Sequence, residues 1–447
     1  MKAAAGRINI TPENGIPMGG NVRIDNKSRG VHDDLFCNIL MIDDKNTETC
    51  LMGFDFVGLK YETCNEIKKK VSKTTGIAAS NIMIWGTHTH SGPDTCMRMY
   101  HGIDEIIGEY LDETIAKVAE GAGEIQKNYI EADLRIGRKE VRDLSFNRRL
   151  VRKDGTVVMN FESFEADDIV GATGPTDPEL LVLSVWNKRG GLHACLVNFT
   201  LHPAVLVGYK WLISRDFIHY LDEYMLDAYG RDTVVLFANG AEGNINHLNF
   251  NKADQWRDFR ETRRIGRKLG RHAGECIESS HAIEGPILFE SKTVALPLRE
   301  ITRQEMEWAD MVLERDRDKV EDMFDGIPDK TYAKMIKGML ERPDKEFETV
   351  IQGMAVGELA IITFPGEVYV EFGLEVKKRS AFEYTMVIGL ANSQSGYIPK
   401  EEAFSQGGYE VRTAWSSQLV YNAGDILVEL VDGKILGPMA NKKGRAK

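Results

Sequence analysis

Several features that would place this chain in a specialised class are missing from its sequence. No stretch of the 447 residues approaches the roughly 20 apolar residues that a membrane-spanning helix needs. The six cysteines are scattered and contain no Cys-x-x-Cys pair, a pattern typical of free, mostly buried thiols in a cytoplasmic protein. The first residues, MKAAAGRINITPENG, lack the apolar run of a secretion signal. We therefore expect a cytoplasmic location.

Positive charge is also in short supply. The chain has 56 Lys and Arg residues against 68 Asp and Glu residues, a formal net charge of −12. No basic stripe is evident that would reverse this balance, so we expect neither nucleic acid nor an anionic membrane as a partner. The composition, 43% hydrophobic and 28% charged, is ordinary for a globular enzyme with a sizeable core. A small molecule remains as the expected partner, and a homo-oligomer stays open.

Short apolar runs recur along the chain and alternate with helical stretches. LFCNILMID, NIMIWG, TVVLFANG and TMVIGLAN are examples of the runs, and YETCNEIKKKVSKTTG is one of the helical stretches. This alternation predicts an α/β fold with a mixed central sheet flanked by helices. There is no internal repeat and no low-complexity linker, so we expect a single domain over residues 1–447.

One region differs from the rest in composition. Residues 302–350 are rich in charge and predict two helices, the first starting at a capping box of Thr302 and Glu305. Gly326-Ile327-Pro328 is expected to separate the two. We expect a helical insertion within the domain whose charges form a solvated face. A lid or a subunit contact is the alternative.

Two of only ten histidines stand one residue apart in GTHTHSGPDT, directly after the apolar run NIMIW. Side chains alternate between the faces of a strand, so His88 and His90 are predicted to project to the same side. Ser91-Gly92-Pro93 then turns the chain. Two imidazoles at a strand end suit a metal, or a metal ligand beside an acid/base group, but two structural histidines fit equally well.

Other strand ends carry polar groups of the same kind. LVNFTLHP brings His202 to a strand end, ITFPGEVY places Glu367 after a Pro-Gly turn, and a Gly/Ser-rich loop holds Tyr397 and Tyr409. Open α/β sheets present their sites at such positions. Each feature alone is compatible with a structural role, but together they form an N/O donor set that suits Zn²⁺.

In this order the segments resemble the catalytic domain of the neutral/alkaline non-lysosomal ceramidase family. Residues 86–93 match the family's Gly-Thr-His-Thr-His-Ser-Gly-Pro motif without a change, and NFTLH, PGE and GLANSQSGY match further family motifs. The resemblance implies a second active-site tyrosine at Tyr409 and a substrate-binding arginine in Asn147-Arg148. The zinc ligands that it implies are His88, His202, Glu367 and Tyr397.

The chain also departs from the family's pattern. The stretch that carries the family's proposed nucleophilic serine reads Ala241-Glu242-Gly243-Asn244-Ile245-Asn246, which puts Asn244 at the serine position. The C-terminal sandwich domain and the secretion signal of the family have no counterpart. The charged stretch after Thr302 is a poor apolar surface for a membrane lipid. We therefore expect the catalytic domain alone, acting on a substrate other than ceramide.

The chemistry of these side chains suggests separate roles. Asp55 and Asp216 are candidates to orient the ligand histidines, with a helix cap or turn as the alternative for both. Four residues are predicted to act on the substrate: His90 as general base, Tyr409 as oxyanion donor or acid, Asn244 as a positioning amide and Arg148 as a clamp for a carboxylate.

These observations predict a zinc-dependent hydrolase that cleaves an amide or ester bond of a small polar, carbohydrate-like substrate. Metal-activated water is the expected nucleophile, because Asn244 is a poor one. The alternative enzyme is a metal-assisted lyase, in which a Tyr/His pair performs β-elimination from a uronate-type sugar. A non-catalytic, metal-stabilised binding protein is the third hypothesis, and it leaves His90 and Tyr409 without a task.

Overall fold

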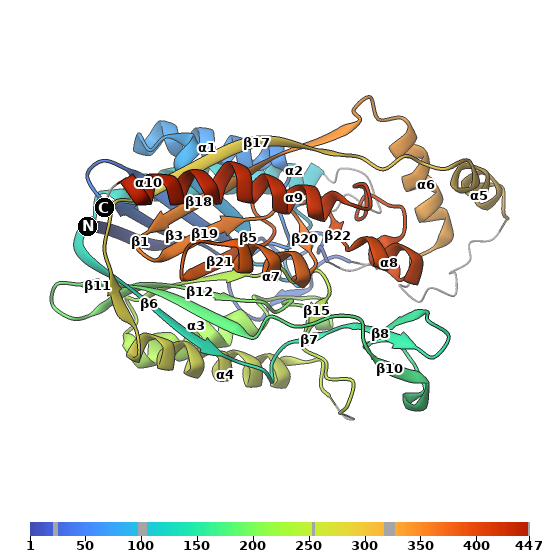
Figure 1. The fold of residues 1–447 in the computed structure, drawn as a ribbon, viewed down its shortest axis with the longest axis horizontal. Coiled ribbons are helices and arrows are strands. Elements are labelled where there is room, and N and C mark those ends of the chain that lie inside the picture. The colour runs from blue at the N-terminus through green and yellow to red at the C-terminus, as the bar shows by residue number, and fades with distance from the viewer. Residues whose placement is uncertain (21–25, 97–104, 253–254, 317–326, 446–447) are drawn as a thin grey trace.

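Two β-sheets packed face to face form the centre of the molecule, and helices cover both outer sides (Figure 1). The computed structural model describes residues 1–20, 26–96, 105–252, 255–316 and 327–445. The prediction of an α/β fold with a mixed sheet flanked by helices is confirmed. The second sheet was not predicted, because apolar runs in a sequence do not show which sheet each strand joins.

The larger sheet has nine strands and is mixed. Most neighbours are antiparallel, but β4 pairs with β5, and β12 with β14, in parallel. In spatial order the strands are β14 (Val234–Asn239), β12 (Leu192–Phe199), β11 (Glu179–Asn187), β6 (Ile130–Glu140), β1 (Lys2–Asn9), β3 (Phe36–Asp43), β4 (Glu48–Phe54) and β5 (Ile82–Gly86), with β16 (His281–Ile283) beside β6.

The smaller sheet consists of β17 (Leu288–Pro297), β18 (Glu346–Val356), β19 (Leu359–Thr363) and β21 (Tyr384–Ile388). Its last two strands are parallel. Apolar side chains of both sheets, such as Leu51, Leu236 and Ile361, form one buried cluster between them. The amide of Asn198 spans this interface, since its Nδ2 donates to the carbonyls of Ala238 in one sheet and Val387 in the other.

Three groups of helices cover the outer faces of the two sheets. On the larger sheet, α1 (Tyr61–Thr75) and α2 (Glu105–Gln126) cover one half, and α3 (Phe217–Tyr229) and α4 (Phe259–Glu278) the other. On the smaller sheet lie α7 (Val370–Arg379), α9 (Ala423–Val431), a π-helical turn (Asp432–Leu436) and α10 (Gly437–Arg445). Within the described ranges, no helix is both long enough and apolar enough to span a bilayer.

The predicted helical insertion contains α5 (Arg303–Leu313) and α6 (Asp329–Leu340). The capping box at Thr302 and Glu305 is present. Gly326, part of the predicted break, lies outside the described residues. The predicted end at residue 350 is wrong, because residues 346–350 belong to β18 and pair along their length with β17. Strand pairing therefore ends the helical segment earlier than its charge pattern does.

The remaining elements are short. Two-stranded pairs are formed by β2 (Gly30–Val31) with β13 (Leu212–Ile213), β7 (Phe146–Asn147) with β15 (Ile245–Asn246), and β20 (Glu367–Val368) with β22 (Tyr397–Ile398). A small sheet contains β8 (Arg149–Arg152), β9 (Val157–Met159) and β10 (Ile169–Ala172), and α8 (Glu401–Gln406) precedes Tyr409. All six cysteines are free thiols, and five are buried, as predicted. The single domain over residues 1–447 stays a prediction.

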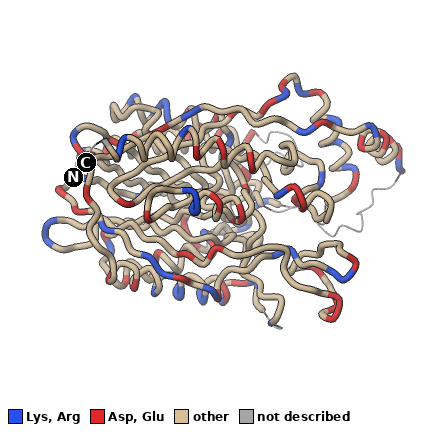
Figure 2. Tube along the Cα trace, viewed as in Figure 1, with Lys and Arg blue, Asp and Glu red and all other residues tan. Residues whose placement is uncertain are grey.

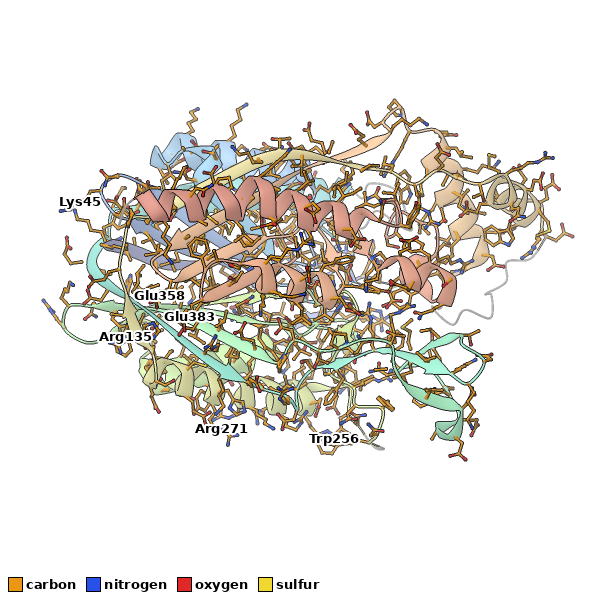
Figure 3. The ribbon with its side chains drawn as sticks, in the orientation of Figure 1. Lys45, Arg135, Trp256, Arg271, Glu358 and Glu383 are labelled. Atoms are coloured by element: carbon orange, nitrogen blue, oxygen red, sulfur yellow. The ribbon has the colours of Figure 1, made fainter. Side chains whose placement is uncertain are left out.

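One outer surface carries more positive charge than the composition suggests. Figure 2 shows Lys and Arg along the lower edge of the molecule, over α4. Figure 3 places Trp256 and Arg271 at this same edge. A basic stripe is therefore present on α4, but the net charge of the chain stays at −12, and the expectation on nucleic acid and anionic membranes stays a prediction. The stripe forms because helix positions three and four residues apart share one face, which a whole-chain charge count does not register.

Candidate metal centre

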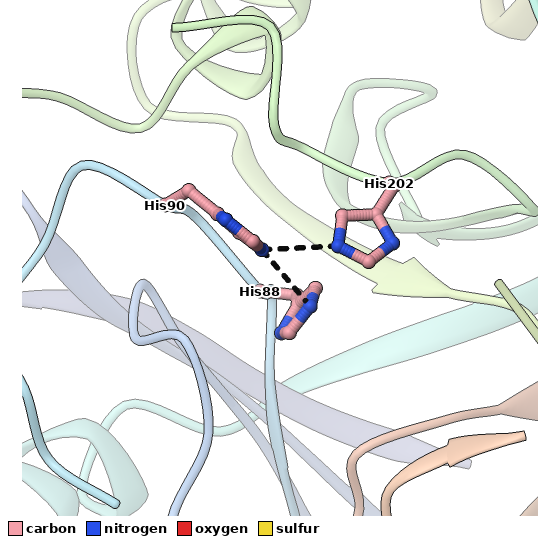
Figure 4. Close-up of side chains that lie close together, drawn as sticks. All are labelled: His88, His90 and His202. Carbon is pink, nitrogen blue, oxygen red and sulfur yellow. Dashed lines mark hydrogen bonds between the residues drawn. The ribbon is translucent and has the colours of Figure 1, made fainter. Parts of the chain in front are cut away.

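Three histidine side chains converge just beyond the ends of β5 and β12 (Figure 4). Nε2 of His90 lies 3.2 Å from Nε2 of His88 and 3.0 Å from Nε2 of His202. These three histidines are the one group of at least three metal-ligating side chains among the described residues whose ligand atoms all lie within 4.8 Å of one another. His88 and His202 are buried, and His90 keeps partial exposure.

Backbone carbonyls orient two of these imidazoles. Nδ1 of His88 bonds the carbonyl of Val57, and Nδ1 of His202 lies 3.5 Å from the carbonyl of Glu242. When Nδ1 donates to a carbonyl, Nε2 keeps its lone pair, which here faces the cluster. This is the tautomer in which a neutral imidazole binds a metal through Nε2.

The third imidazole, that of His90, is held by a glycine. The backbone of Gly20 lies directly beside it. Gly20 has φ +78°, and a Cβ atom there would lie 2.6 Å from Cγ of His90. Only glycine satisfies both conditions, so this close contact sets the position of the ring. Burial and the neighbouring His88 lower the pKa of His90 to about 3, which keeps its imidazole neutral.

The predicted strand geometry of the two motif histidines is wrong. β5 ends at Gly86, and His88 adopts a left-handed backbone conformation with φ +73°. The imidazoles of His88 and His90 nevertheless meet, with ring centroids 4.7 Å apart. Their proximity thus comes from a strained turn, a conformation that is concentrated at functional sites, and not from alternation along a strand.

Glu367 adds a carboxylate to the three imidazoles. Its Oε2 lies 3.3 Å from Nε2 of His88 and 3.9 Å from Nε2 of His202. Burial alone would raise the pKa of Glu367, but His88 and other neighbours lower it to about 2. Oε2 accepts no hydrogen bond from any described group, whereas Oε1 accepts one from Gln394 at 3.0 Å. A buried, ionised oxygen without a donor, beside three imidazole nitrogens, fits a cation.

Tyr397 and Tyr409 lie beside this carboxylate. Tyr397 pairs with Glu367 across β20 and β22, and its hydroxyl contributes to the lowered pKa of that carboxylate. The Oη atoms of Tyr397 and Tyr409 are 3.4 Å apart. Burial raises the pKa of both tyrosines, so both hydroxyls stay protonated at neutral pH. A phenol in this position can donate a hydrogen bond to a reacting oxygen.

Arg148 lies against both tyrosine rings, with its Cζ 5.5 Å and 5.3 Å from their centroids. Its Nε donates to Glu410 at 3.1 Å and its Nη2 to the carbonyl of Gly243 at 2.7 Å. Arg149 binds the other oxygen of Glu410 at 2.6 Å. Glu410 was not among the predicted site residues. It is a fully buried carboxylate next to Tyr409, and a buried carboxylate needs a cationic partner, which the adjacent pair Arg148 and Arg149 provides.

The chain is similar to known proteins of one enzyme family. The family described as neutral/alkaline non-lysosomal ceramidase, N-terminal, matches residues 2–240. This chain belongs to that ceramidase family. His88, His90, Arg148 and His202 lie inside the matched range, and Glu367, Tyr397 and Tyr409 follow it.

The ceramidase relatives agree with this assignment. The neutral ceramidase of Pseudomonas aeruginosa is 24% identical over 280 residues, which cover 58% of this chain and 39% of that protein. The matched part thus spans about two fifths of that relative's length. A crystal structure of neutral ceramidase from Pseudomonas aeruginosa covers 97% of this chain and 73% of its own, with TM-score 0.73 and 18% identity. A structure titled "Ceramidase complexed with C2" covers 97% and 74%, with TM-score 0.75 and 17% identity.

In this ceramidase-family chain, Asn244 has a task in the fold. Its Nδ2 donates to Glu371 at 3.0 Å, and its Oδ1 accepts the N–H of Val370 at 2.9 Å, the first residue of α7. Its backbone carbonyl accepts the N–H of Arg148 at 2.9 Å. The side-chain amide therefore caps α7, and the backbone carbonyl of the same residue bonds Arg148. The predicted contact with substrate stays a prediction.

Replacing Asn244 with alanine is expected to lower the free energy of unfolding by about 1 kcal/mol, the effect of losing a helix cap. Denaturant unfolding measures it, with the exposed Asn251→Ala in the same region as the matched control. The wild-type protein should also show no acyl adduct on Asn244 by mass spectrometry after incubation with an activated ester. Unchanged stability with a large loss of turnover would instead assign the amide to the substrate.

The two predicted orienting aspartates have structural tasks in this family member. Asp216 caps α3, accepting from the N–H of Phe217 at 2.7 Å. Asp55 pairs with Arg215 at 2.7 Å and accepts from Thr87 at 3.2 Å. Among the contacts of the described residues, neither carboxylate reaches an imidazole of the cluster. The helix cap, one of the two structural alternatives, is present at Asp216, whereas Asp55 forms a buried ion pair that was not predicted.

A groove of about 1140 Å³ lies beside the cluster, and Glu367 and Gln394 are among its lining residues. Its walls carry charged, polar and aromatic side chains of both signs, among them Lys60, Tyr61, Arg342, Glu346, Glu348 and Trp415. A polar molecule matches these walls better than an acyl chain does.

Proposed function

We propose that this ceramidase-family protein is a metal-dependent hydrolase that cleaves an amide or ester bond of a small polar, carbohydrate-like molecule. One observation carries the proposal: three imidazoles meet beside Glu367, whose carboxylate has an oxygen without a hydrogen-bond donor and lines a groove with charged and polar walls. Family membership supports hydrolysis. No observation favours the lyase or the binding-protein alternative.

The proposed metal is Zn²⁺. Neutral imidazoles, a carboxylate and a phenol make a donor set that zinc accepts. A bound zinc ion supplies Lewis acidity, which polarises a carbonyl group and lowers the pKa of water. The residues that we propose hold it are His88, His202, Glu367 and Tyr397. The distances from Glu367 to the two histidines and the pairing of Tyr397 with Glu367 across β20 and β22 support this set.

The remaining side chains are proposed to act on the substrate. His90 is the most exposed of the three histidines, and its neutral Nε2 can accept a proton and return it to the leaving group. The protonated hydroxyl of Tyr409 can donate to an oxyanion. Arg148 uses two N–H groups on Glu410 and Gly243, so others remain for a substrate carboxylate.

The substrate class follows from the groove. The charged and polar residues of its walls support a polar small molecule over the acyl chain of ceramide. Neither nucleic acid nor a membrane is proposed as the substrate surface. A cytoplasmic location belongs to the same proposal and is supported by the six free cysteines.

A substrate panel tests the proposed function. Purified protein is incubated with chromogenic esters, N-acyl amino sugars, uronate oligosaccharides and ceramide micelles, and products are identified by mass spectrometry. We expect an acid plus an amine or alcohol from a polar substrate and no turnover of ceramide. An unsaturated sugar product with new ultraviolet absorption would establish the lyase instead. Binding without turnover of any compound would favour the non-catalytic protein.

A further inference from the structure

The outer face of α4 carries a dense row of cations, here named the basic face. Buried residues of the same helix, such as Ile265 and Leu269, pack into the core beneath it. Residues 256–272 contain seven Lys or Arg against two acids, in a chain of net charge −12 (Figure 2). The basic face consists of Arg260, Arg263, Arg264, Arg267, Lys268 and Arg271, exposed or partly exposed in succession.

Part of this charge has no counter-ion. Arg264 pairs with Glu261 at 2.6 Å, and Arg260 pairs with Asp258 at 2.8 Å. Arg263 and Arg267 instead lie against the rings of Tyr220 and Tyr224, with their Cζ atoms 5.2 Å and 5.8 Å from the centroids. Within the described part of the chain, neither has a carboxylate in ion-pair range. The face therefore keeps a positive potential that attracts anions.

A pocket of about 360 Å³ opens at the N-terminal end of the basic face. His247 lines it, 4% exposed; its ring lies near the backbone of Trp256, and neither ring nitrogen has a hydrogen bond of good geometry among the described groups. Two carboxylates also line the pocket, Asp143 and Glu261, and they pair with Lys268 and Arg264. The remaining lining side chains are Phe146, Asn249, Lys252, Gln255 and Trp256. Buried polar nitrogens without partners in a cavity indicate a ligand with hydrogen-bonding groups.

We propose that the basic face and this pocket bind an acidic polysaccharide. One sugar ring occupies the pocket, where His247 offers a donor and an acceptor to hydroxyl groups. Carboxylate or sulfate groups of neighbouring rings lie along the arginines of α4. From residue 260 to residue 271 the helix rises roughly 16 Å, enough to contact several sugar units. The site is separate from the groove at Glu367, with which it shares no lining residue.

Other anionic partners match this surface less well. Single-stranded nucleic acid is bound on several aromatic platforms, and one face of Trp256 is already covered by Arg260, whose Cζ lies 4.0 Å from the ring centroid. A membrane-surface helix buries its apolar face in lipid, but that face of α4 packs against the sheet. An exposed row of cations beside a sugar-sized polar pocket favours the polysaccharide.

Binding of a fluorescently labelled polygalacturonate oligomer to the full chain tests this proposal, with neutral dextran as the comparison. We expect binding of the acidic oligomer alone, weakening as salt rises. The double variant Arg263→Glu/Arg267→Glu should weaken it about tenfold or more at low salt. The matched control Lys69→Glu/Lys73→Glu makes the same charge change on the exposed side of α1 and should leave the affinity within about twofold.

Further readouts separate the possible outcomes. Hydrolysis of a small ester should be unchanged in the α4 variant, because its positions lie outside the catalytic cluster. Lys252→Ala removes a pocket cation with little risk to folding and should also weaken binding. Equal binding of dextran, equal loss in the α1 control, or tighter binding to duplex DNA or anionic vesicles than to the oligomer would each overturn the proposal. If the charge reversal prevents folding, Arg263→Gln/Arg267→Gln serves in its place.

Discussion

The His202→Ala variant is expected to lose both its bound metal and its hydrolase activity. Nε2 of His202 lies 3.0 Å from Nε2 of His90 and 3.9 Å from Oε2 of Glu367, so its removal takes one donor out of the cluster. Loss of a supporting group around a metal already costs about 10–100-fold in affinity, and loss of a ligand costs more. Elemental analysis should find on the order of one zinc per wild-type chain and a small fraction of that in the variant.

A surface histidine supplies the control for this measurement. His281, on β16, is exposed and bonds Glu358, which is not a residue of the cluster. His281→Ala should keep the full metal content and activity. A full equivalent of metal in His202→Ala, or in Glu367→Gln, would contradict the proposed ligand set. Zinc addition should restore neither variant at concentrations that saturate the wild type, since the donor itself is missing.

Strand-end chemistry was readable from the sequence because parallel strands deliver their C-terminal ends to one edge. Three of the parallel pairs, β4 with β5, β12 with β14 and β19 with β21, precede the turns that carry His88, His202 and Glu367. A polar residue after an apolar run is a local signal. Its meeting with the others follows from the sheet topology, which the structure shows and the runs alone do not.

Features that depend on long-range contacts could not be predicted in the same way. Glu410 finds its two arginines 262 and 261 residues away, and no local pattern announces that pairing. Gly20 contacts His90 through the absence of a side chain, which is silent in a sequence. The basic face of α4 is different, since its spacing is visible in the sequence. An overall charge of −12 obscured it.

The positions of Asn244 and Arg148 show how fold and chemistry share residues in this site. Asn244 receives the N–H of Arg148 on its carbonyl and caps α7 with its amide. The guanidinium of Arg148 in turn lies against Tyr397 and Tyr409. A change that loosens α7 therefore reaches the tyrosines through one arginine.

The His90→Ala and Tyr409→Phe variants are each expected to lower turnover by a factor of about 10² or more, the effect of losing a general acid or base. Metal content and melting temperature should change little, because His90 is partly exposed and Tyr409→Phe keeps the ring that Arg148 contacts. Tyr421→Phe, on an exposed tyrosine, is the matched control and should leave turnover unchanged.

Elemental analysis and steady-state kinetics on the same preparations distinguish whether His90 binds the metal or acts on the substrate. Loss of the metal in His90→Ala would make His90 a third histidine ligand, as its 3.0 Å and 3.2 Å distances to the other two permit. Retained metal with a loss in kcat would place His90 on the substrate side of the centre, where its greater exposure leaves its Nε2 within reach of a reacting group.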